Sequence, residues 1–452
     1  MNPVIIIGNG ISGVTAAREI RKLNPETPIL IISGETDHHF SRTALMYIFM
    51  GHMNYADTKP YADSFWAENR IDLLRGWVTA IDHENHEITM ADDSKLRYSD
   101  LILALGSTSN KFGWPGQDLP GVQGLYSKQD LDQLEDYAKT AKRGVVVGGG
   151  LIGIEMAECL LSRGIPVTFL VREEKFWEIV IPKEEAEMIE KHIREHHCDL
   201  RMAEELDSVF AGDDGKVAYI TTKSGERIDC EIVGLTVGVR PNIDWLSGNE
   251  ALEKDRGIMI DHHFKTNLPN VWAIGDCAQF REPLPGRRPM EQVWYTGKMH
   301  GAFVAQNIAG TAKPYEPGIW WNSAKFFDIE YQTYGMVLPN PPENESSFFW
   351  QAEEGYHTLR INFDTESLAV KGCNVFGMRH RHQVWENWIG SETKVPEVIA
   401  NLAAANFDPE FFKQHEASIL AHWNQSYPEH QVTQKVKRGL FTNLLRSLQP
   451  SL

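Results

Sequence analysis

The chain has 452 residues, 42% of them hydrophobic and 23% charged, which is long and apolar enough for several domains with substantial cores. Its formal net charge of −18 argues against general nucleic-acid binding, which needs a basic surface. The charge is uneven, because no acidic residue follows Glu429 while basic residues continue towards the end of the chain.

The cysteines are few and scattered, without a Cys-x-x-Cys pair or metal-ligand spacing, which favours a reducing compartment over a disulfide framework. The N-terminal apolar run stops at Gly8 without a preceding basic region, so we expect a buried strand there and not a signal peptide. No apolar stretch reaches the roughly 18 residues of a membrane span. We therefore expect a cytoplasmic protein. The five cysteines are Cys159, Cys198, Cys230, Cys277 and Cys373.

The chain begins with a strand–turn–helix pattern. Val4 to Ile7 is a β-branched apolar run typical of a buried parallel strand, and a helical segment follows from Val14 to Leu23. A second strand, Ile29 to Ser33, leads to Glu35, at the distance expected for an acid that binds ribose hydroxyls. The intervening glycines have the spacing G-x-G-x-x-G, which permits a tight turn and lets the backbone approach a pyrophosphate: Gly8, Gly10 and Gly13.

The same pattern recurs in the middle of the chain. Gly144 to Val147 forms a second apolar run, Ile154 to Ser162 a helical segment, and Val167 to Val171 the next strand. The glycines between strand and helix are Gly148, Gly150 and Gly153. Two complete Rossmann patterns predict two dinucleotides, a tightly held flavin and a diffusing nicotinamide, and hence electron transfer between them.

Several further motifs, in this order, resemble the two-dinucleotide-binding-domain flavoproteins of the pyridine nucleotide–disulfide oxidoreductase superfamily. The resemblance is strongest to the rubredoxin/ferredoxin reductase-like group and to the N-terminal half of assimilatory nitrite reductases. The motifs are GNGISG at 8–13, FSRTAL at 40–45, LILALGSTSN at 101–110, GGGLIGIE at 148–155, GVRPN at 238–242 and TNLPNVWAIGDCA at 266–278.

The resemblance implies an α/β fold with two interleaved Rossmann-like domains and a C-terminal α+β interface domain. FAD would be bound by residues 1–112 and 238–310, and NADH or NADPH by residues 113–237. Residues 311–452 would form the interface domain, which implies a homodimer.

The resemblance also assigns candidate site residues. Those expected at FAD, besides the first glycines, are Ser12, Glu35, Arg42, Ala104, Gly106, Gly238, Gly275, Asp276, Glu291, Gln292 and Val293. Those expected at the nicotinamide dinucleotide, besides the second glycines, are Leu151, Ile152, Glu155 and Arg172. The candidate catalytic residues are Arg42, Glu155 and Trp294.

Some of these assignments have alternatives. Arg42 could contact flavin or acceptor, or could be a packing residue, and Tyr47 stands where related reductases carry a Lys. Glu291, Trp294 and Tyr295 could wall the edge of the isoalloxazine, or the two aromatic residues could belong to a core helix.

The stretch FSRTALMYIFMG, where disulfide reductases of the superfamily carry their redox cysteines, contains none, and no His-Pro dipeptide occurs in the chain. We therefore expect electrons to leave the flavin directly for an external acceptor, an iron–sulfur or rubredoxin-type carrier. The alternatives are an NAD(P)H oxidase or small-acceptor reductase, and a nucleotide-sensing flavoprotein that signals by changing partners.

The histidines do not predict a metal site. His192 and His196 are four residues apart, but the charges around them favour a solvated helix face, and the run RHRH at 379–382 lacks partners at metal spacing. We expect no bound metal.

Coenzyme choice depends on the residues after the second Rossmann strand. Arg172 could hold a 2′-phosphate, whereas Glu173 or Glu174 could hold a free ribose diol. The balance slightly favours acceptance of NADPH.

The C-terminal third contains three strand-like runs, Ala324 to Met336, Phe348 to Phe363 and Ala369 to Phe376, and helical patterns from about Gln383. The final segment combines apolar residues at helical spacing with positive charge. We expect it to dock on an acidic partner or an anionic membrane, or to pack on the protein's own acidic surface. Its residues are Leu440, Phe441, Leu444, Leu445 and Leu448, with Lys435, Lys437, Arg438 and Arg446.

Overall fold

The computed structural model describes residues 1–433 and divides the chain into two compact units. The first contains Met1–Trp177 and Ile189–Pro317, and the second contains Glu178–Met188 and the chain from Gly318 onward. Within the described residues, no helix is long and apolar enough to cross a membrane.

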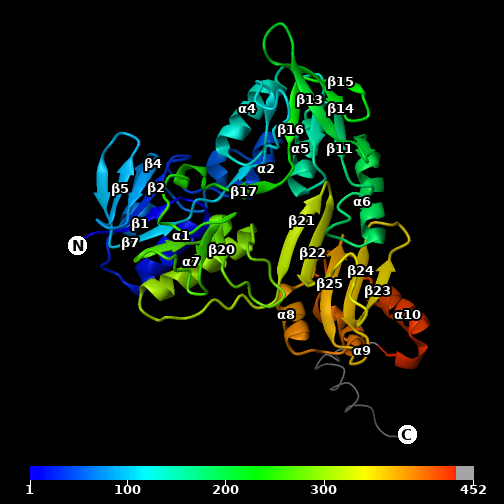
Figure 1. Ribbon diagram of the computed structural model, residues 1–452. Helices are drawn as coiled ribbons and strands as arrows, with labels where there is room; N and C mark the ends of the chain where they lie inside the picture. The colour runs from blue at the N-terminus through cyan, green and yellow to red at the C-terminus, as the bar shows by residue number, and fades with distance from the viewer. Residues whose placement is uncertain (434–452) are drawn as a thin grey trace. The chain divides into compact units, whose positions relative to one another are not determined.

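The first unit contains a five-stranded parallel sheet built from distant parts of the chain (Figure 1). The central strand of this sheet pairs with its two neighbours through apolar residues, so that Ile5 lies beside both Leu30 and Leu101. In strand order, the sheet comprises β19 (Val271–Ala273), β7 (Asp100–Leu103), β1 (Val4–Ile7), β2 (Ile29–Ser33) and β3 (Ile71–Arg75). Because β19 joins strands from the first hundred residues, the sheet requires a long inserted piece of chain.

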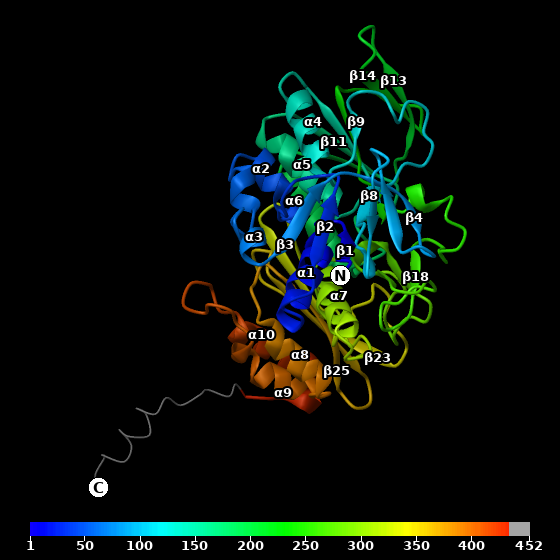
Figure 2. The same cartoon turned by 90° about the vertical axis from the view of Figure 1, so that its left-hand side faces the viewer.

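Two helices far apart in the sequence pack together beside this sheet. They are α1 (Ile11–Leu23) and α7 (Trp294–Ile308), which lie next to each other in Figures 1 and 2. A Cβ added to Gly301 of α7 would lie 2.5 Å from the backbone oxygen of Ser12, so a larger residue there would push the helices apart.

The inserted piece forms a second five-stranded parallel sheet. In strand order it comprises β12 (Asp199–Met202), β11 (Val167–Val171), β10 (Gly144–Val147), β16 (Ile232–Leu235) and β9 (Val122–Gln123). The accompanying helices are α4 (Lys128–Ala138), α5 (Leu151–Ser162) and α6 (Lys183–Glu195). Both predicted Rossmann patterns are therefore confirmed as strand, glycine turn and helix.

The chain enters and leaves this piece through one antiparallel pair, β8 (Ser107–Ser109) with β17 (Val239–Pro241). Asn110 donates its backbone N–H to the carbonyl of Gly238 at 3.0 Å, so the two crossing segments touch. The remaining elements of the unit are short: α2 (Leu45–Phe49), α3 (Phe65–Glu68), β4 (Val78–Asp82), β5 (Glu87–Met90), β6 (Lys95–Arg97), β13 (Leu206–Ala211), β14 (Val217–Thr222), β15 (Arg227–Asp229), β18 (Ile258–Ile260) and β20 (Ala278–Phe280).

The second unit is an antiparallel sheet with helices on one face (Figure 1). In strand order, the sheet comprises β21 (Trp321–Phe326), β22 (Ile329–Gly335), β25 (Val370–Phe376), β24 (Thr358–Asp364) and β23 (Glu345–Gln351). The helices are α8 (His382–Gly390), α9 (Val395–Ala400) and α10 (Glu416–Ser426). Their shared core includes Ile361 from the sheet and the fully buried Trp385 and Trp423 from the helices.

Two details differ from the sequence expectations. The first two strand-like runs are each a hairpin, because Phe327 adopts a positive φ of 55° in one and Gly355 a φ of 93° in the other, which turns the chain back. The expectation that His192 lies on a solvated helix face is wrong. Its exposure is only 5%, and it lies beside the buried Ile189 and Ile193 on α6.

Candidate functional site

The two glycine loops share one geometry. Gly8 and Gly148 have φ values of 115° and 111°, which L side chains rarely adopt. A Cβ on Gly8 would lie 2.1 Å from the carbonyl oxygen of Ala104, and one on Gly148 would lie 2.7 Å from that of Thr236. The first glycine of each loop therefore lets the end of its strand lie close to the backbone that follows the neighbouring strand.

The third glycine of each loop lets the helix approach the turn. A Cβ on Gly13 would lie 2.1 Å from the Gly8 carbonyl oxygen, and one on Gly153 would lie 2.4 Å from that of Gly148. These positions are filled by the protein's own backbone, so they serve packing and not a ligand.

The middle glycine of each loop behaves differently. A Cβ on Gly10 or Gly150 would meet no atom within 4 Å. These two residues are the N-caps of α1 and α5, and neither helix has a side-chain cap or an acid in its first turn. The free N–H groups and the positive end of the helix dipole face space that a dinucleotide pyrophosphate fits.

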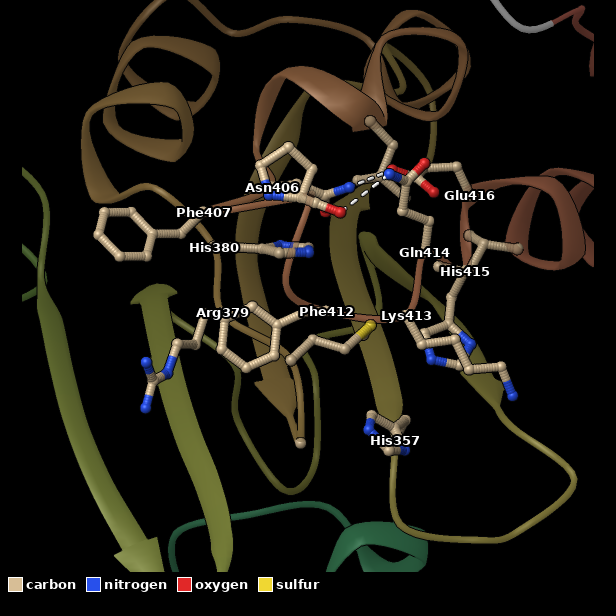
Figure 3. Close-up of a pocket in the computed structure, with 15 residues that line it drawn as sticks. His357, Arg379, His380, Asn406, Phe407, Phe412, Lys413, Gln414, His415 and Glu416 are labelled. Atoms are coloured by element: carbon tan, nitrogen blue, oxygen red, sulfur yellow. Dashed lines mark hydrogen bonds between the residues drawn. The ribbon is translucent and has the colours of Figure 1, made fainter.

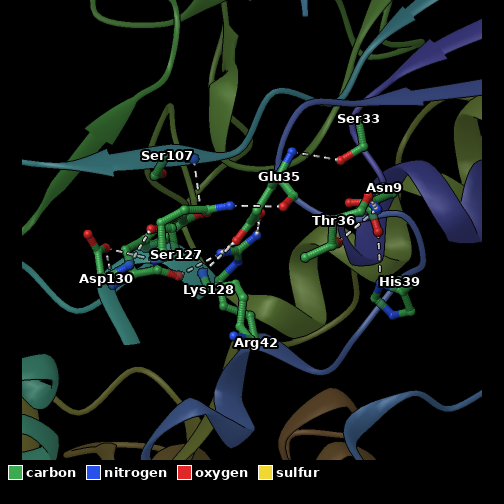
Figure 4. A network of polar contacts seen from close by, with 12 residues as sticks. Asn9, Ser33, Glu35, Thr36, His39, Arg42, Ser107, Ser127, Lys128 and Asp130 are labelled. Carbon is green, nitrogen blue, oxygen red and sulfur yellow. Dashed lines mark hydrogen bonds and ion pairs between the residues drawn. The ribbon is translucent and has the colours of Figure 1, made fainter. Parts of the chain in front are cut away.

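Glu35 lies at the centre of a polar network beside the first loop (Figure 4). Arg42 donates to both carboxylate oxygens, at 2.8 Å from Nη1 and 2.5 Å from Nη2, and the backbone N–H of Lys128 donates to Oε1 at 2.9 Å. Burial pushes the pKa of Glu35 up, but the hydrogen bonds and charge of Arg42 outweigh it and the pKa is lowered. The ion pair thus keeps Glu35 ionised without placing net negative charge near the pyrophosphate position.

A second part of this network fixes the first loop itself. Asn9 donates from Nδ2 to the carbonyl oxygen of Thr36 at 2.8 Å, and His39 Nδ1 lies 2.8 Å from the Asn9 carbonyl oxygen. Burial lowers the pKa of His39 to about 4, so the imidazole is neutral and donates from Nδ1 to that carbonyl. Figure 4 shows these side chains holding residues 8–13 against the segment after β2.

Asp276 is half-buried and is held by hydroxyl groups from two other segments. Its Oδ2 accepts hydrogen bonds from Ser107 Oγ at 3.0 Å and from Tyr126 Oη at 3.3 Å. Gln292 Nε2 donates to Ser107 Oγ at 2.9 Å. Burial raises the pKa of Asp276 above its usual value, and the two hydroxyl donors limit that rise. Ser107 therefore bridges Asp276 and Gln292, while Tyr126 contacts Asp276; the sequence analysis assigned neither Ser107 nor Tyr126 to the site.

Ser12, Gly275 and α7 converge at one point. A Cβ on Gly275 would lie 2.3 Å from Ser12 Oγ, and one on Gly297 of α7 would lie 2.7 Å from the same atom. The buried His300 accepts the Gly275 N–H through Nδ1 at 3.1 Å, and burial lowers its pKa to about 3. A neutral imidazole thus holds the Gly275–Asp276 turn against the first glycine loop.

The candidates before and at the start of α7 have mixed surroundings. Glu291 forms a buried ion pair with Arg287, at 2.7 Å between Oε2 and Nη2, so its carboxylate is engaged within the protein. Val293 is the N-cap of α7, and Trp294 packs edge-to-face on Tyr295 with ring centroids 5.4 Å apart. Both rings are half-buried, which suits the wall of a ring-binding site as well as helix packing.

The candidates for the nicotinamide dinucleotide lie around α5. Leu151, Ile152 and Glu155 occupy its first turns and are half-buried. Arg172 follows β11, is 71% exposed at its side chain, and donates from Nε to Glu173 at 2.8 Å. Its guanidinium is thus exposed and paired with the neighbouring acid.

Three further candidates belong to the backbone between the sheets. Ala104 is buried against Gly8, while Gly106 and Gly238 have φ values of 67° and 85° on either side of the β8–β17 pair. Their conformations turn the chain where it passes between the two sheets.

All five cysteines are buried, and none of them forms a disulfide bond. Cys159 in α5 points to the carbonyl oxygen of Met46, and Cys277 contacts the carbonyl oxygens of Leu103 and Ile274. Burial raises the pKa of Cys277 to about 12. These are packing positions and not those of reactive thiolates.

Two matched glycine loops, an acid after β2 and a Gly–Asp turn against the first loop define a flavoprotein with two dinucleotide sites. The chain belongs to the pyridine nucleotide–disulphide oxidoreductase family, whose model matches residues 2–301. It is an oxidoreductase that uses FAD together with NADH or NADPH.

Among curated relatives, the rubredoxin–NAD(+) reductase of Acinetobacter baylyi is 30% identical over 63% of this chain and 74% of its own length. The coenzyme A disulfide reductase of Staphylococcus haemolyticus is 28% identical over 88% of this chain and 94% of its own. A solved NAD-dependent persulfide reductase from A. fulgidus superposes with a TM-score of 0.81 at 21% identity, covering 95% of this chain and 83% of that one. The structural match confirms the predicted α/β fold, including the C-terminal sheet domain.

Proposed function

We propose that this oxidoreductase passes electrons from NAD(P)H through FAD to a separate one-electron carrier protein of the iron–sulfur or rubredoxin type. Bound FAD would supply the chemistry by accepting a hydride and releasing its two electrons one at a time. The protein's task is to hold the two dinucleotides in line and to exclude water between them. The names of similar proteins, including a rubredoxin–NAD(+) reductase, support this acceptor class.

One observation carries the proposal. The segment 40–51 after β2 contains no cysteine, and the five cysteines of the chain are buried and form no disulfide bond. No thiol is therefore placed in this segment to relay electrons to a disulfide substrate, such as the one named for the coenzyme A disulfide reductase. Bound FAD would therefore pass its electrons directly to an external acceptor.

The test is an anaerobic double-mixing stopped-flow experiment. The FAD-loaded enzyme is reduced with one equivalent of NADH or NADPH and then mixed with oxidised rubredoxin, an oxidised [2Fe–2S] ferredoxin, dioxygen or coenzyme A disulfide. We expect at least one carrier protein to reoxidise the flavin about tenfold faster or more than dioxygen or the disulfide does.

A control reaction uses enzyme that has been treated with a thiol-alkylating reagent, and its rates should be unchanged. Fastest reoxidation by dioxygen would instead identify an NAD(P)H oxidase. Slow reduction followed by a persistent charge-transfer band with every acceptor would identify a nucleotide sensor.

We also propose that the chain acts as a cytoplasmic homodimer through its second unit. Five buried cysteines that form no disulfide bond suit a reducing compartment. The second unit exposes Phe407, Phe411 and Phe412, with Phe411 at 80%, which is unusual for a surface that stays in water. Sedimentation velocity at micromolar concentration tests the dimer.

A further inference from the structure

The second unit brings metal-ligating side chains together from two segments that are distant in the sequence. Glu354 and His357 lie in the turn between β23 and β24, and His415 is the residue immediately before α10. One ligand atom from each of the three residues lies within 4.8 Å of the others. His357 Nδ1 and Glu354 Oε1 are 2.6 Å apart, and the two imidazole centroids are 5.0 Å apart.

His415 is held in place before any ligand arrives. Its exposure is 6%, its ring packs on Trp350 with centroids 5.2 Å apart, and its carbonyl oxygen accepts from the N–H of Ile419 as α10 begins. No group among residues 1–433 forms a hydrogen bond with its buried Nε2 atom. A buried, fixed imidazole nitrogen without a partner is a ligand position that needs little reorganisation.

The other two residues can move to complete a site. Their turn is closed by backbone hydrogen bonds, from Ala352 N to His357 O and from Gly355 N to Ala352 O, both at 2.9 Å. The side chains of His357 and Glu354 remain 32% and 41% exposed. Tetrahedral Zn²⁺ places its ligand atoms roughly 3.3 Å apart, so only these two exposed side chains have to adjust.

We propose that Glu354, His357 and His415 form a zinc-binding site in the second unit, with water as the fourth ligand. Two imidazoles and one carboxylate are a donor set that Zn²⁺ takes in proteins, and imidazole also favours late transition metals over Mg²⁺ or Ca²⁺. Both imidazoles line the pocket of about 50 Å³ drawn in Figure 3, which is large enough for a water molecule, whereas Glu354 is not among its lining residues. The sequence analysis expected no metal after considering only the histidines at 192 and 196 and the run at 379–382, and it did not consider these three residues.

Lys413 is the main opposing charge. It lines the same pocket, and its positive charge helps to lower the pKa values of Glu354 and His415. For Glu354, the larger causes of the lowered pKa are its own backbone hydrogen bond and the hydrogen bond with His357; for His415, the larger causes are burial and the charge of His357. Removing the ammonium should therefore strengthen the binding of a cation.

The site would join the β23–β24 turn to the segment before α10. Because a bound metal stabilises only the folded state, Zn²⁺ should raise the melting temperature of the second unit. This effect is independent of flavin chemistry and of the identity of the electron acceptor.

The experiment titrates ZnCl2 into the chelator-treated, FAD-loaded enzyme by isothermal titration calorimetry. We expect a site whose affinity falls about tenfold or more in His415→Ala and in His357→Ala, while flavin reduction by NAD(P)H is unchanged. Lys413→Gln should bind Zn²⁺ more tightly than the parent enzyme, and this gain cannot arise from misfolding. Anomalous X-ray scattering at the zinc edge should place the ion beside His415.

Two control variants separate this site from adventitious binding. His422→Ala removes an exposed imidazole from α10 in the same unit, and His192→Ala removes one of the pair on α6. Unchanged affinity in both His415→Ala and His357→Ala, or loss of binding in His192→Ala alone, would overturn the proposal. Weaker binding by Lys413→Gln would also contradict it.

Discussion

At the scale of single residues, the three glycines of each loop do different work. Gly8 and Gly148 are required by their positive φ, and Gly13 and Gly153 by backbone contacts, whereas Gly10 and Gly150 face open space. Gly10 has a φ of −69° and Gly150 a φ of −111°, both accessible to any residue. Substitutions at these two positions should therefore report on the dinucleotides and not on folding.

Gly10→Val should give a folded protein that lacks FAD, because its side chain would occupy the approach of the pyrophosphate. Gly150→Val is the matched control: it should keep its FAD but need about tenfold more NAD(P)H for the same rate of flavin reduction. Circular dichroism measures folding, flavin absorbance measures FAD content, and stopped-flow spectroscopy measures the dependence of flavin reduction on coenzyme concentration. Full flavin occupancy in soluble Gly10→Val would remove the first loop from the FAD site.

Arg172 provides a test of coenzyme choice. Arg172→Ala should raise the KM for NADPH by about tenfold and leave that for NADH nearly unchanged, because a guanidinium–phosphate hydrogen bond is worth roughly 1.5–3 kcal/mol. Steady-state kinetics with both coenzymes measure the ratio. Glu173→Gln, which removes the partner of Arg172 in the structure, is the control and should not weaken NADPH binding. Equal effects of Arg172→Ala on both coenzymes would exclude the phosphate role.

The glycine spacing could be read from sequence because each loop is local, with strand, turn and helix in one continuous stretch. Tyr126 and His300 could not be found in this way, since they meet Asp276 and Gly275 only after distant segments pack. The pairing of Glu35 with Arg42 was missed for a related reason. Both residues were assigned separately to ligands, and only the folded segment after β2 shows them bound to each other.

At the scale of elements, helix α6 contributes an unusual buried charge to the second unit. Glu185 is fully buried, and Arg360 of β24 lies 3.2 Å from its Oε1 and also donates to Glu184 at 2.7 Å. Burial raises the pKa of Glu185 from 4.5 to about 7, even though the positive charge of Arg360 acts in the other direction. The folded state therefore keeps this proton over a pH range in which the unfolded chain has lost it.

The sign of the effect on stability follows from that difference. Below about pH 4.5 both states are protonated, and as pH rises towards 7 the unfolded state alone releases the proton, so stability falls by roughly 3 kcal/mol. Glu185→Gln should flatten this decline, so that its stability relative to the parent protein improves between pH 5 and pH 8. Glu184→Gln is the control and should keep the parent slope. Denaturant unfolding at several pH values measures the free energy of unfolding. If that free energy changed with pH equally in Glu185→Gln and the parent protein, the raised pKa of Glu185 would be contradicted.

The strands of the second unit show where sequence patterns lose resolution. Periodicity marks Phe348 to Phe363 as strand-like throughout, but the chain reverses at the turn that contains Gly355. A run of alternating side chains cannot distinguish one long strand from a tight hairpin unless the turn residues are weighted as strongly as the alternation.

At the scale of the whole molecule, the predicted docking segment, which contains Leu440 and the other apolar and basic residues named above, lies outside the described residues. The structure does show where a truncation should begin. Val432 exchanges backbone hydrogen bonds with the Asn424 side chain, and His430 accepts one from Trp423, so residues up to 433 belong to the packing of α10.

Deleting residues 434–452 should leave FAD content, flavin reduction and the melting temperature unchanged. It should weaken association with the acceptor protein or with anionic vesicles, and low salt should strengthen the association of the intact protein. Acceptor kinetics and vesicle cosedimentation at two ionic strengths measure this. A truncated enzyme that unfolds or becomes monomeric would show that the segment is structural and does not dock.

The contact between Asn110 and Gly238 bears on whether the inserted stretch could be replaced by another domain. The ends of the intervening stretch, which carries a complete Rossmann sheet, lie one hydrogen bond apart. Closing a loop over so short a span imposes almost no geometric constraint on what the loop contains. The stretch therefore has the architecture of an inserted domain that can be exchanged. A different nucleotide-binding domain could join the chain at the same two points without altering the strand register of the first parallel sheet.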